Sequence, residues 1–122
     1  MLEAFVFLLI ILQVKHWYID FVNQTMEEVE SKGKYGDLHG ILHSLKHGIG
    51  TMFCVLAVTG YPYLVFALVL GFIDFAIHYH VDWTKMNYGN RDIQDPEFWN
   101  HLGLDQMAHQ VTYILLAYSV VA

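Results

Sequence analysis

Long apolar stretches alternate with short polar ones along the chain, and this pattern predicts four helices. The apolar stretches run from about Leu2 to Val22, Leu38 to Thr59, Pro62 to Trp83 and Pro96 to Val121. Each has roughly the 20 residues that a helix needs to cross the hydrocarbon core of a bilayer. Residues 48–73 contain no Asp, Glu, Lys or Arg, and a soluble domain of 122 residues could hardly bury such a run. The pattern therefore favours an integral membrane protein.

Capping and turn signals set the ends of these helices. Asp37 and Asp95 are the expected N-caps of the second and fourth helices. Pro62 and Pro96 suit the first turn of a helix, where the missing N–H costs no hydrogen bond. Residues 23–37 and 84–95 are polar and predict loops, whereas residues 59–62 predict a tight turn. The expected fold is all-α: one domain over residues 1–122, built as an up-down-up-down bundle of four transmembrane helices.

The basic residues predict the orientation of the bundle. Lys32, Lys34, Lys85 and Arg91 lie in or beside the two polar loops, and none lies at the termini or in the tight turn. By the positive-inside rule, the polar loops face the cytoplasm and both termini face outward, which suggests a bacterial inner membrane. Glu3 stands where a signal peptide would have basic residues, so we expect the first helix to be retained. The net charge of −6 excludes a basic surface for nucleic acid.

Eight histidines add candidate chemistry, because most lie four residues from another His or from an Asp. These sets are His16/Asp20, His39/His43/His47, Asp74/His78/Asp82 and Asp105/His109. Positions i and i+4 share one face of a helix. Since the four helices alternate in direction, all the sets fall in the half of the bundle nearest the polar loops. Ionisable side chains inside a membrane are costly, so a polar cluster near one membrane face indicates function.

Imidazole and carboxylate groups together predict a divalent metal, with zinc favoured, iron or manganese as alternatives and haem less favoured. The expected ligands are His16, Asp20, His39, His43, His78, Asp82, Asp105 and His109. Outer support is expected from Gln24, His47, Asp74 and Gln106. Two alternatives stay open. The histidines of the second helix could form a polar stripe at the lipid headgroups, and Asp74 could hydrogen-bond His47 and hold the bundle together without metal.

Three classes of function fit this cluster. The first is a metal-dependent hydrolase in which Asp20, Asp82 or Asp105 acts as general base and Lys85 stabilises an anion on a lipid-linked or phosphorylated substrate. The second is a small transporter, or a protein that responds to metal or protons, whose path a homo-oligomer could complete. The third is a redox site holding two irons or a haem. The lipid bilayer is the one partner that all three require.

The same residues resemble an uncharacterised family of small membrane proteins from bacteria and phages, the domain of unknown function 3307. Four motifs carry the resemblance over most of the chain: His16-x3-Asp20-Phe-x2-Gln24, the pair His39/His43, His78-x3-Asp82-x2-Lys85, and Asp105-Gln106-x2-His109. The resemblance implies a shared polar site, but no established activity. His47 and Asp74 lie outside these motifs. The site type is also similar to that of membrane-embedded metal hydrolases.

Overall fold

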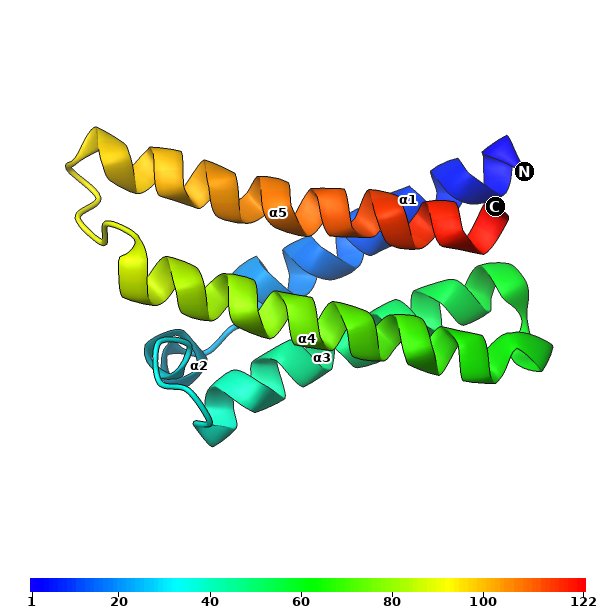
Figure 1. Ribbon diagram of the computed structural model, residues 1–122, viewed down its shortest axis with the longest axis horizontal. Helices are drawn as coiled ribbons and strands as arrows, with labels where there is room; N and C mark the ends of the chain where they lie inside the picture. The colour runs from blue at the N-terminus through cyan, green and yellow to red at the C-terminus, as the bar shows by residue number, and fades with distance from the viewer.

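The computed structural model describes residues 1–122 and consists entirely of helices and their connections, as the sequence predicts. Its long helices are α1 (Leu2–Trp17), α3 (Leu38–Thr59), α4 (Leu64–Tyr88) and α5 (Pro96–Val121). Short elements join them: a π-helical turn at Tyr18–Val22, the helix α2 (Met26–Ser31) and a 3₁₀ turn at Tyr61–Tyr63. Successive long helices run in opposite directions, so that both termini lie at one end and α2 lies at the other (Figure 1).

The helix ends follow from local chemistry. The side chains of Asp37 and Asp95 accept hydrogen bonds from backbone N–H groups at the starts of α3 and α5, which confirms both predicted caps. Gly60 ends α3 with φ of 82°, a left-handed conformation that favours glycine. Helix α2 lies inside a predicted loop, and Thr25 caps it by accepting a hydrogen bond from the backbone N–H of Glu28. The sequence Thr-x-x-Glu is therefore a capping signal that the sequence analysis missed.

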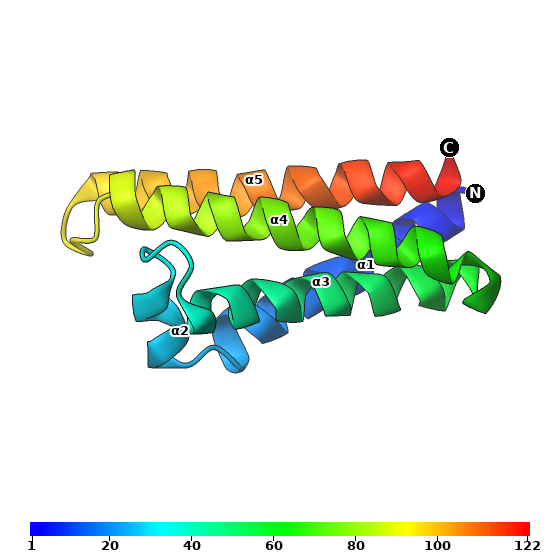
Figure 2. The same ribbon diagram turned by 60° about the horizontal axis from the view of Figure 1, so that its bottom comes forward.

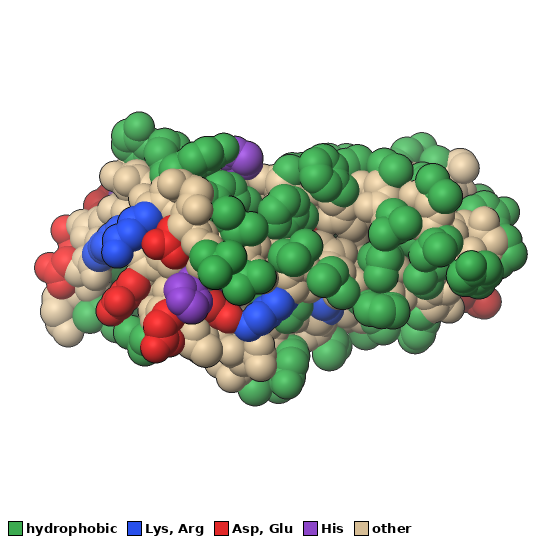
Figure 3. Space-filling model, turned by 90° about the horizontal axis from the view of Figure 1, so that it is seen from below, with side chains coloured by type: hydrophobic (Ala, Val, Ile, Leu, Met, Phe, Trp, Pro, Cys, Tyr) green, Lys and Arg blue, Asp and Glu red, His purple; other side chains and the backbone are tan.

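Three helical segments are long and apolar enough to cross a membrane: Leu2–Val22, Leu38–Thr59 and Tyr61–Tyr88. Only 28%, 33% and 28% of their most apolar windows are buried inside the protein, so most of their apolar side chains point outward. Figure 3 shows hydrophobic side chains spread over much of one face, with most of the charged side chains gathered towards one end. Such a surface suits acyl chains rather than water.

The interior of the bundle divides into an apolar half and a polar half. The apolar core lies towards the termini and consists of Leu8, Leu12, Val55, Ala67, Leu70, Tyr113, Leu116 and Ala117. Figure 2 shows α2 at the end of the bundle opposite the two termini. The polar half lies towards α2 and contains the buried histidines and carboxylates. The buried polar side chains therefore lie in one half of the bundle, as the sequence predicts.

Helices α3 and α4 approach each other closely at a pair of glycines. A Cβ atom on Gly48 would lie 2.7 Å from the carbonyl oxygen of Gly71, and one on Gly71 would lie 2.6 Å from that of Gly48. No side chain fits there, so the two backbones touch. Small residues allow this kind of approach between membrane helices, whose association depends on van der Waals packing.

We expect Gly71→Ala to lower the free energy of unfolding by about 1–3 kcal/mol, because the added methyl group must push α3 and α4 apart. Gly103→Ala is the matched control, since nothing lies within 4 Å of a Cβ at that position of α5. It should be neutral or stabilise by up to about 1 kcal/mol through helix propensity. Unfolding in detergent micelles measures both, and equal effects would contradict the contact.

Candidate metal centre

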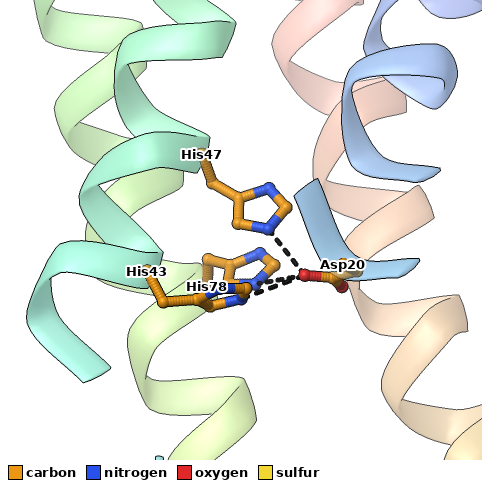
Figure 4. Close-up of side chains that lie close together, drawn as sticks. All are labelled: Asp20, His43, His47 and His78. Atoms are coloured by element: carbon orange, nitrogen blue, oxygen red, sulfur yellow. Dashed lines mark hydrogen bonds and ion pairs between the residues drawn. The ribbon is translucent and has the colours of Figure 1, made fainter. Parts of the chain in front are cut away.

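Three histidines surround the carboxylate of Asp20, which lies in the π-helical turn that ends the first long helix. Its Oδ1 atom lies 2.7 Å from Nε2 of His47, 3.0 Å from Nε2 of His43 and 3.8 Å from Nε2 of His78. The two α3 residues are one turn apart, and His78 reaches the same oxygen from α4 (Figure 4). Three helices thus direct four side chains to one point.

These four side chains fit the coordination of a metal ion. Each offers one ligand atom, the four atoms lie within 4.8 Å of one another, and all four residues are buried. The Nε2 atoms of His43 and His78 lie near carboxylate oxygens but make no hydrogen bond of suitable geometry, which is unusual for buried polar atoms. Three imidazole nitrogens and one carboxylate oxygen form a donor set that suits zinc.

The outer nitrogen of His43 is fixed by a carboxylate on α2. Its Nδ1 lies 3.0 Å from Oε2 of Glu28, and Lys46 binds the other oxygen of the same carboxylate. Burial alone would raise the pKa of Glu28, but the hydrogen bonds from Lys46 and His43 hold it below its usual range. An ionised Glu28 accepts the Nδ1–H proton of His43, which leaves the Nε2 lone pair free to bind metal.

A second group of potential ligands, His78, Asp82 and His109, adjoins the first and shares His78 with it. The carboxylate of Asp82 lies 3.2 Å from Nε2 of His78 and 3.3 Å from Nε2 of His109. Asp105 extends the group, with Oδ1 3.4 Å from Nε2 of His109. The rings of His47, His78 and His109 are stacked in that order, with centroids 3.6 and 4.0 Å apart.

Charge pairing separates the two groups. Each buried carboxylate but one has a lysine within 4 Å: the pairs are Asp74–Lys15, Asp82–Lys32, Asp105–Lys85 and Glu28–Lys46. Asp20 has no lysine, and its oxygens meet only imidazole nitrogens. A buried carboxylate needs a compensating charge. Asp20 is therefore the position at which an added cation would be most stabilised, whereas Lys32 already compensates Asp82.

His16 lies against this cluster, but both of its ring nitrogens already have hydrogen-bond partners. Its Nδ1 is 2.9 Å from the hydroxyl of Tyr113, and its Nε2 is 2.9 Å from Oε1 of Gln106. The same Nε2 is 3.3 Å from Oδ2 of Asp20. In this arrangement His16 supports the carboxylate of Asp20 from outside, and it is in neither group of potential ligands.

Lys15 is the centre of a separate buried contact deeper in the bundle. Its ammonium group donates to Oδ2 of Asp74 at 3.0 Å and to the hydroxyl of Tyr113 at 3.1 Å, and its Nζ lies 3.2 Å from Nδ1 of His47. Thr51 also donates to Asp74, at 2.6 Å. Asp74 therefore does not hydrogen-bond His47 directly, as the sequence alone would have allowed, because Lys15 lies between them.

The remaining predicted residues divide into those near the site and one outside it. Gln106 joins His16 to Asp105, since its Nε2 donates to Oδ2 of Asp105 at 3.0 Å. Gln24 donates to the backbone carbonyl of Asp20 at 2.9 Å. His39 is exposed in the first turn of α3 and is in neither group. His47, expected to support the site, instead provides one of the four potential ligand atoms.

Four residues of the polar half were not predicted: Lys15, Glu28, Lys32 and Tyr113. Lys15 had a signal, because it is the one Lys or Arg in a segment long and apolar enough to cross a bilayer, and such a charge requires a partner. Glu28 could have been noticed as the last residue of the Thr-x-x-Glu capping signal of α2. Lys32 and Tyr113 gave no periodic signal, and only the packing of α2 and α5 brings them to the site.

Comparison with known families gives one match. A family described as "Protein of unknown function (DUF3307)" matches residues 7–122, which includes every residue of the two groups. Neither a curated protein nor a solved structure matches the chain.

Proposed function

The chain belongs to the DUF3307 family, whose function is unknown, and we propose that it is an integral membrane metalloprotein that binds one divalent ion, zinc. The ligands in this proposal are Asp20, His43, His47 and His78. The observation that carries it is the environment of Asp20, a buried carboxylate that faces three Nε2 atoms and has no lysine. One ion is proposed because lysines already compensate the neighbouring carboxylates.

The reaction that we propose for this centre is hydrolysis. A divalent ion with an open position lowers the pKa of a bound water and provides hydroxide near neutral pH. Asp82 adjoins the ligands, with Oδ2 3.2 Å from Nε2 of His78 and 3.7 Å from Nε2 of His43, so it is the proposed general base. Asp82 would then pass the proton through His109 to Asp105. Lys32 and Lys85 are cations that would stabilise an anionic substrate.

The same proposal includes the membrane topology. Helix α5 would be the fourth span, because it lies antiparallel to α4 and has 26 residues. With basic residues around α2 and the α4–α5 connection, the polar half would lie at the cytoplasmic side of a bacterial inner membrane, and both termini would face outward. Polar residues in the first half of α5 would be tolerated because Asp105 and His109 point into the bundle.

A second candidate function is a site that responds to protons or ions, or a small transporter. It is favoured by the polar contacts that lead from Asp105 through Gln106, His16 and Tyr113 to Lys15 and Asp74. Beyond Asp74 the bundle is filled by the apolar core, so this chain of contacts does not cross one protomer. A transport path would need a homo-oligomer.

Metal content tests the proposed centre. Protein purified in detergent should hold about one zinc ion per chain, and the double variant His43→Ala/His47→Ala should hold almost none, because it lacks two of the four ligands. His39→Ala is the matched control: it removes a histidine one turn away on the same helix, but an exposed one. Wild-type protein with no more metal than the double variant would refute the centre.

Asp82→Asn separates hydrolysis from metal binding. We expect this variant to keep its zinc, because Asp82 is not among the four ligands, and to hydrolyse nitrophenyl phosphodiesters and esters about 10²–10⁴-fold more slowly than wild type. The assay is done in mixed micelles, with and without a zinc chelator. Zinc-loaded wild-type protein that is inactive on every ester class would contradict the hydrolase and leave the metal centre intact.

A further inference from the structure

A groove lies between α4 and α5 on the outside of the polar half. Its volume is about 780 Å³, which is within the usual range of ligand sites. Its apolar lining includes Ala76, Ile77, Val81, Leu104 and Ala108. Lys85, Asp105 and His101 lie in the same lining and give the groove a polar portion.

The groove adjoins the candidate metal centre through a single carboxylate. Asp105 lines the groove and is almost fully buried, with 2% of its side chain exposed. Its Oδ2 lies 3.2 Å from Nζ of Lys85, and its Oδ1 lies 3.4 Å from Nε2 of His109. His109 in turn contacts Asp82. A ligand whose polar group reaches Lys85 is therefore separated from the proposed general base only by Asp105 and His109.

The position of the groove decides which kind of ligand can enter. Its α4 residues belong to the candidate span Tyr61–Tyr88, so the apolar part faces acyl chains rather than water. Lys85 is 25% exposed and supplies a positive charge in the groove. Lys85 is partly exposed, whereas its partner Asp105 is almost fully buried, so the groove presents apolar walls and one accessible cation. This combination complements a molecule that has an acyl chain and a phosphate group.

We propose that this groove binds an anionic phospholipid that enters sideways from the bilayer, with its acyl chain between α4 and α5 and its phosphate paired with Lys85. Asp105 then keeps its contact with His109 while Lys85 pairs with the phosphate. The inference rests on the proposed function, since it identifies the substrate class of that centre as a lipid phosphate ester.

Retained lipid tests the groove without any assay of activity. Protein is purified in detergent that contains equal amounts of phosphatidylglycerol and phosphatidylcholine, and mass spectrometry measures the lipid that stays bound. Wild type should retain phosphatidylglycerol preferentially, and Lys85→Met should reduce that preference about fivefold through the loss of one cation at the membrane surface. Ala108→Trp should remove both lipids from the groove, whereas Val69→Trp, on an exposed part of α4 outside the groove, should retain them.

The outcomes separate the groove from the metal centre. Equal retention of both lipids by wild type and Lys85→Met would overturn the inference, and so would displacement of phosphatidylglycerol by the same concentration of inorganic phosphate. If Ala108→Trp does not fold, Ala76→Trp fills the same groove. Lys85→Met still tests whether the groove prefers phosphatidylglycerol because of its cation. Zinc is measured on every sample: full zinc without lipid preference overturns only the groove, and no zinc in wild type overturns the proposed function.

Discussion

Asp20→Asn is expected to lower the affinity for zinc by well over a hundredfold. The substitution keeps the size of the side chain but removes the negative charge that faces the three imidazole nitrogens. Loss of a partner outside the ligand shell typically costs about 10–100-fold, so loss of a charged ligand should exceed that range. Competition with a chromogenic zinc chelator measures the affinity.

Glu28→Gln provides the graded comparison for this prediction. Glu28 contacts only the outer nitrogen of His43, so its loss should reduce the affinity by about 10–100-fold. The expected order of affinities is wild type, then Glu28→Gln, then Asp20→Asn. An Asp20→Asn variant that binds zinc as tightly as wild type would show that the ion, if present, lies elsewhere in the cluster.

Lys15→Met is expected to lower the free energy of unfolding by about 3–5 kcal/mol, the usual cost of removing one partner of a buried ion pair. The side chain of Lys15 is 7% exposed and that of Asp74 is 1% exposed. Without the ammonium group, the Asp74 carboxylate keeps only the hydroxyl of Thr51 as a donor. Methionine preserves the length of the side chain, so packing changes little. Unfolding of the detergent-purified protein gives the free energy.

The double variant Lys15→Met/Asp74→Asn is the control for charge. It removes both members of the pair, and we expect it to be more stable than Lys15→Met alone, because no uncompensated charge remains in the apolar interior. If the effects of the two substitutions simply add, the ion pair does not account for the loss.

The helices show how much of the fold follows from the sequence. The predicted bounds of α3 and α5 agree with the structure, because Asp37 and Asp95 cap their starts and a glycine or the chain end closes them. Helix α4 continues to Tyr88, beyond the predicted end at Trp83, since the chain has no helix-breaking residue before Gly89. Helix α2 is too short and too polar to show hydrophobic periodicity.

The histidines of α3 show where sequence reasoning about the site ends. Their spacing places His39, His43 and His47 on one face of the helix, and this much could be predicted. Which of the three histidines are buried depends on how the neighbouring helices pack against that face. His39 is exposed, whereas His43 and His47 are fully buried. The choice of lysine partners has the same origin, because a long flexible side chain such as that of Lys32 can reach any of several carboxylates.

The tight turn at Gly60 has a consequence for how the protein enters the membrane. Alone, α4 would place Asp74 and Asp82 in lipid, and an aspartate near the centre of an inserted helix costs about 2.5–3.5 kcal/mol. Because so few residues join α3 to α4, and because Gly48 and Gly71 let their backbones touch, the two can insert together as a hairpin. Thr51 on α3 donates a hydrogen bond to Asp74, so the hairpin alone would already provide a partner for that carboxylate. The short turn would therefore let α3 lower the cost of inserting the aspartates of α4 into the membrane.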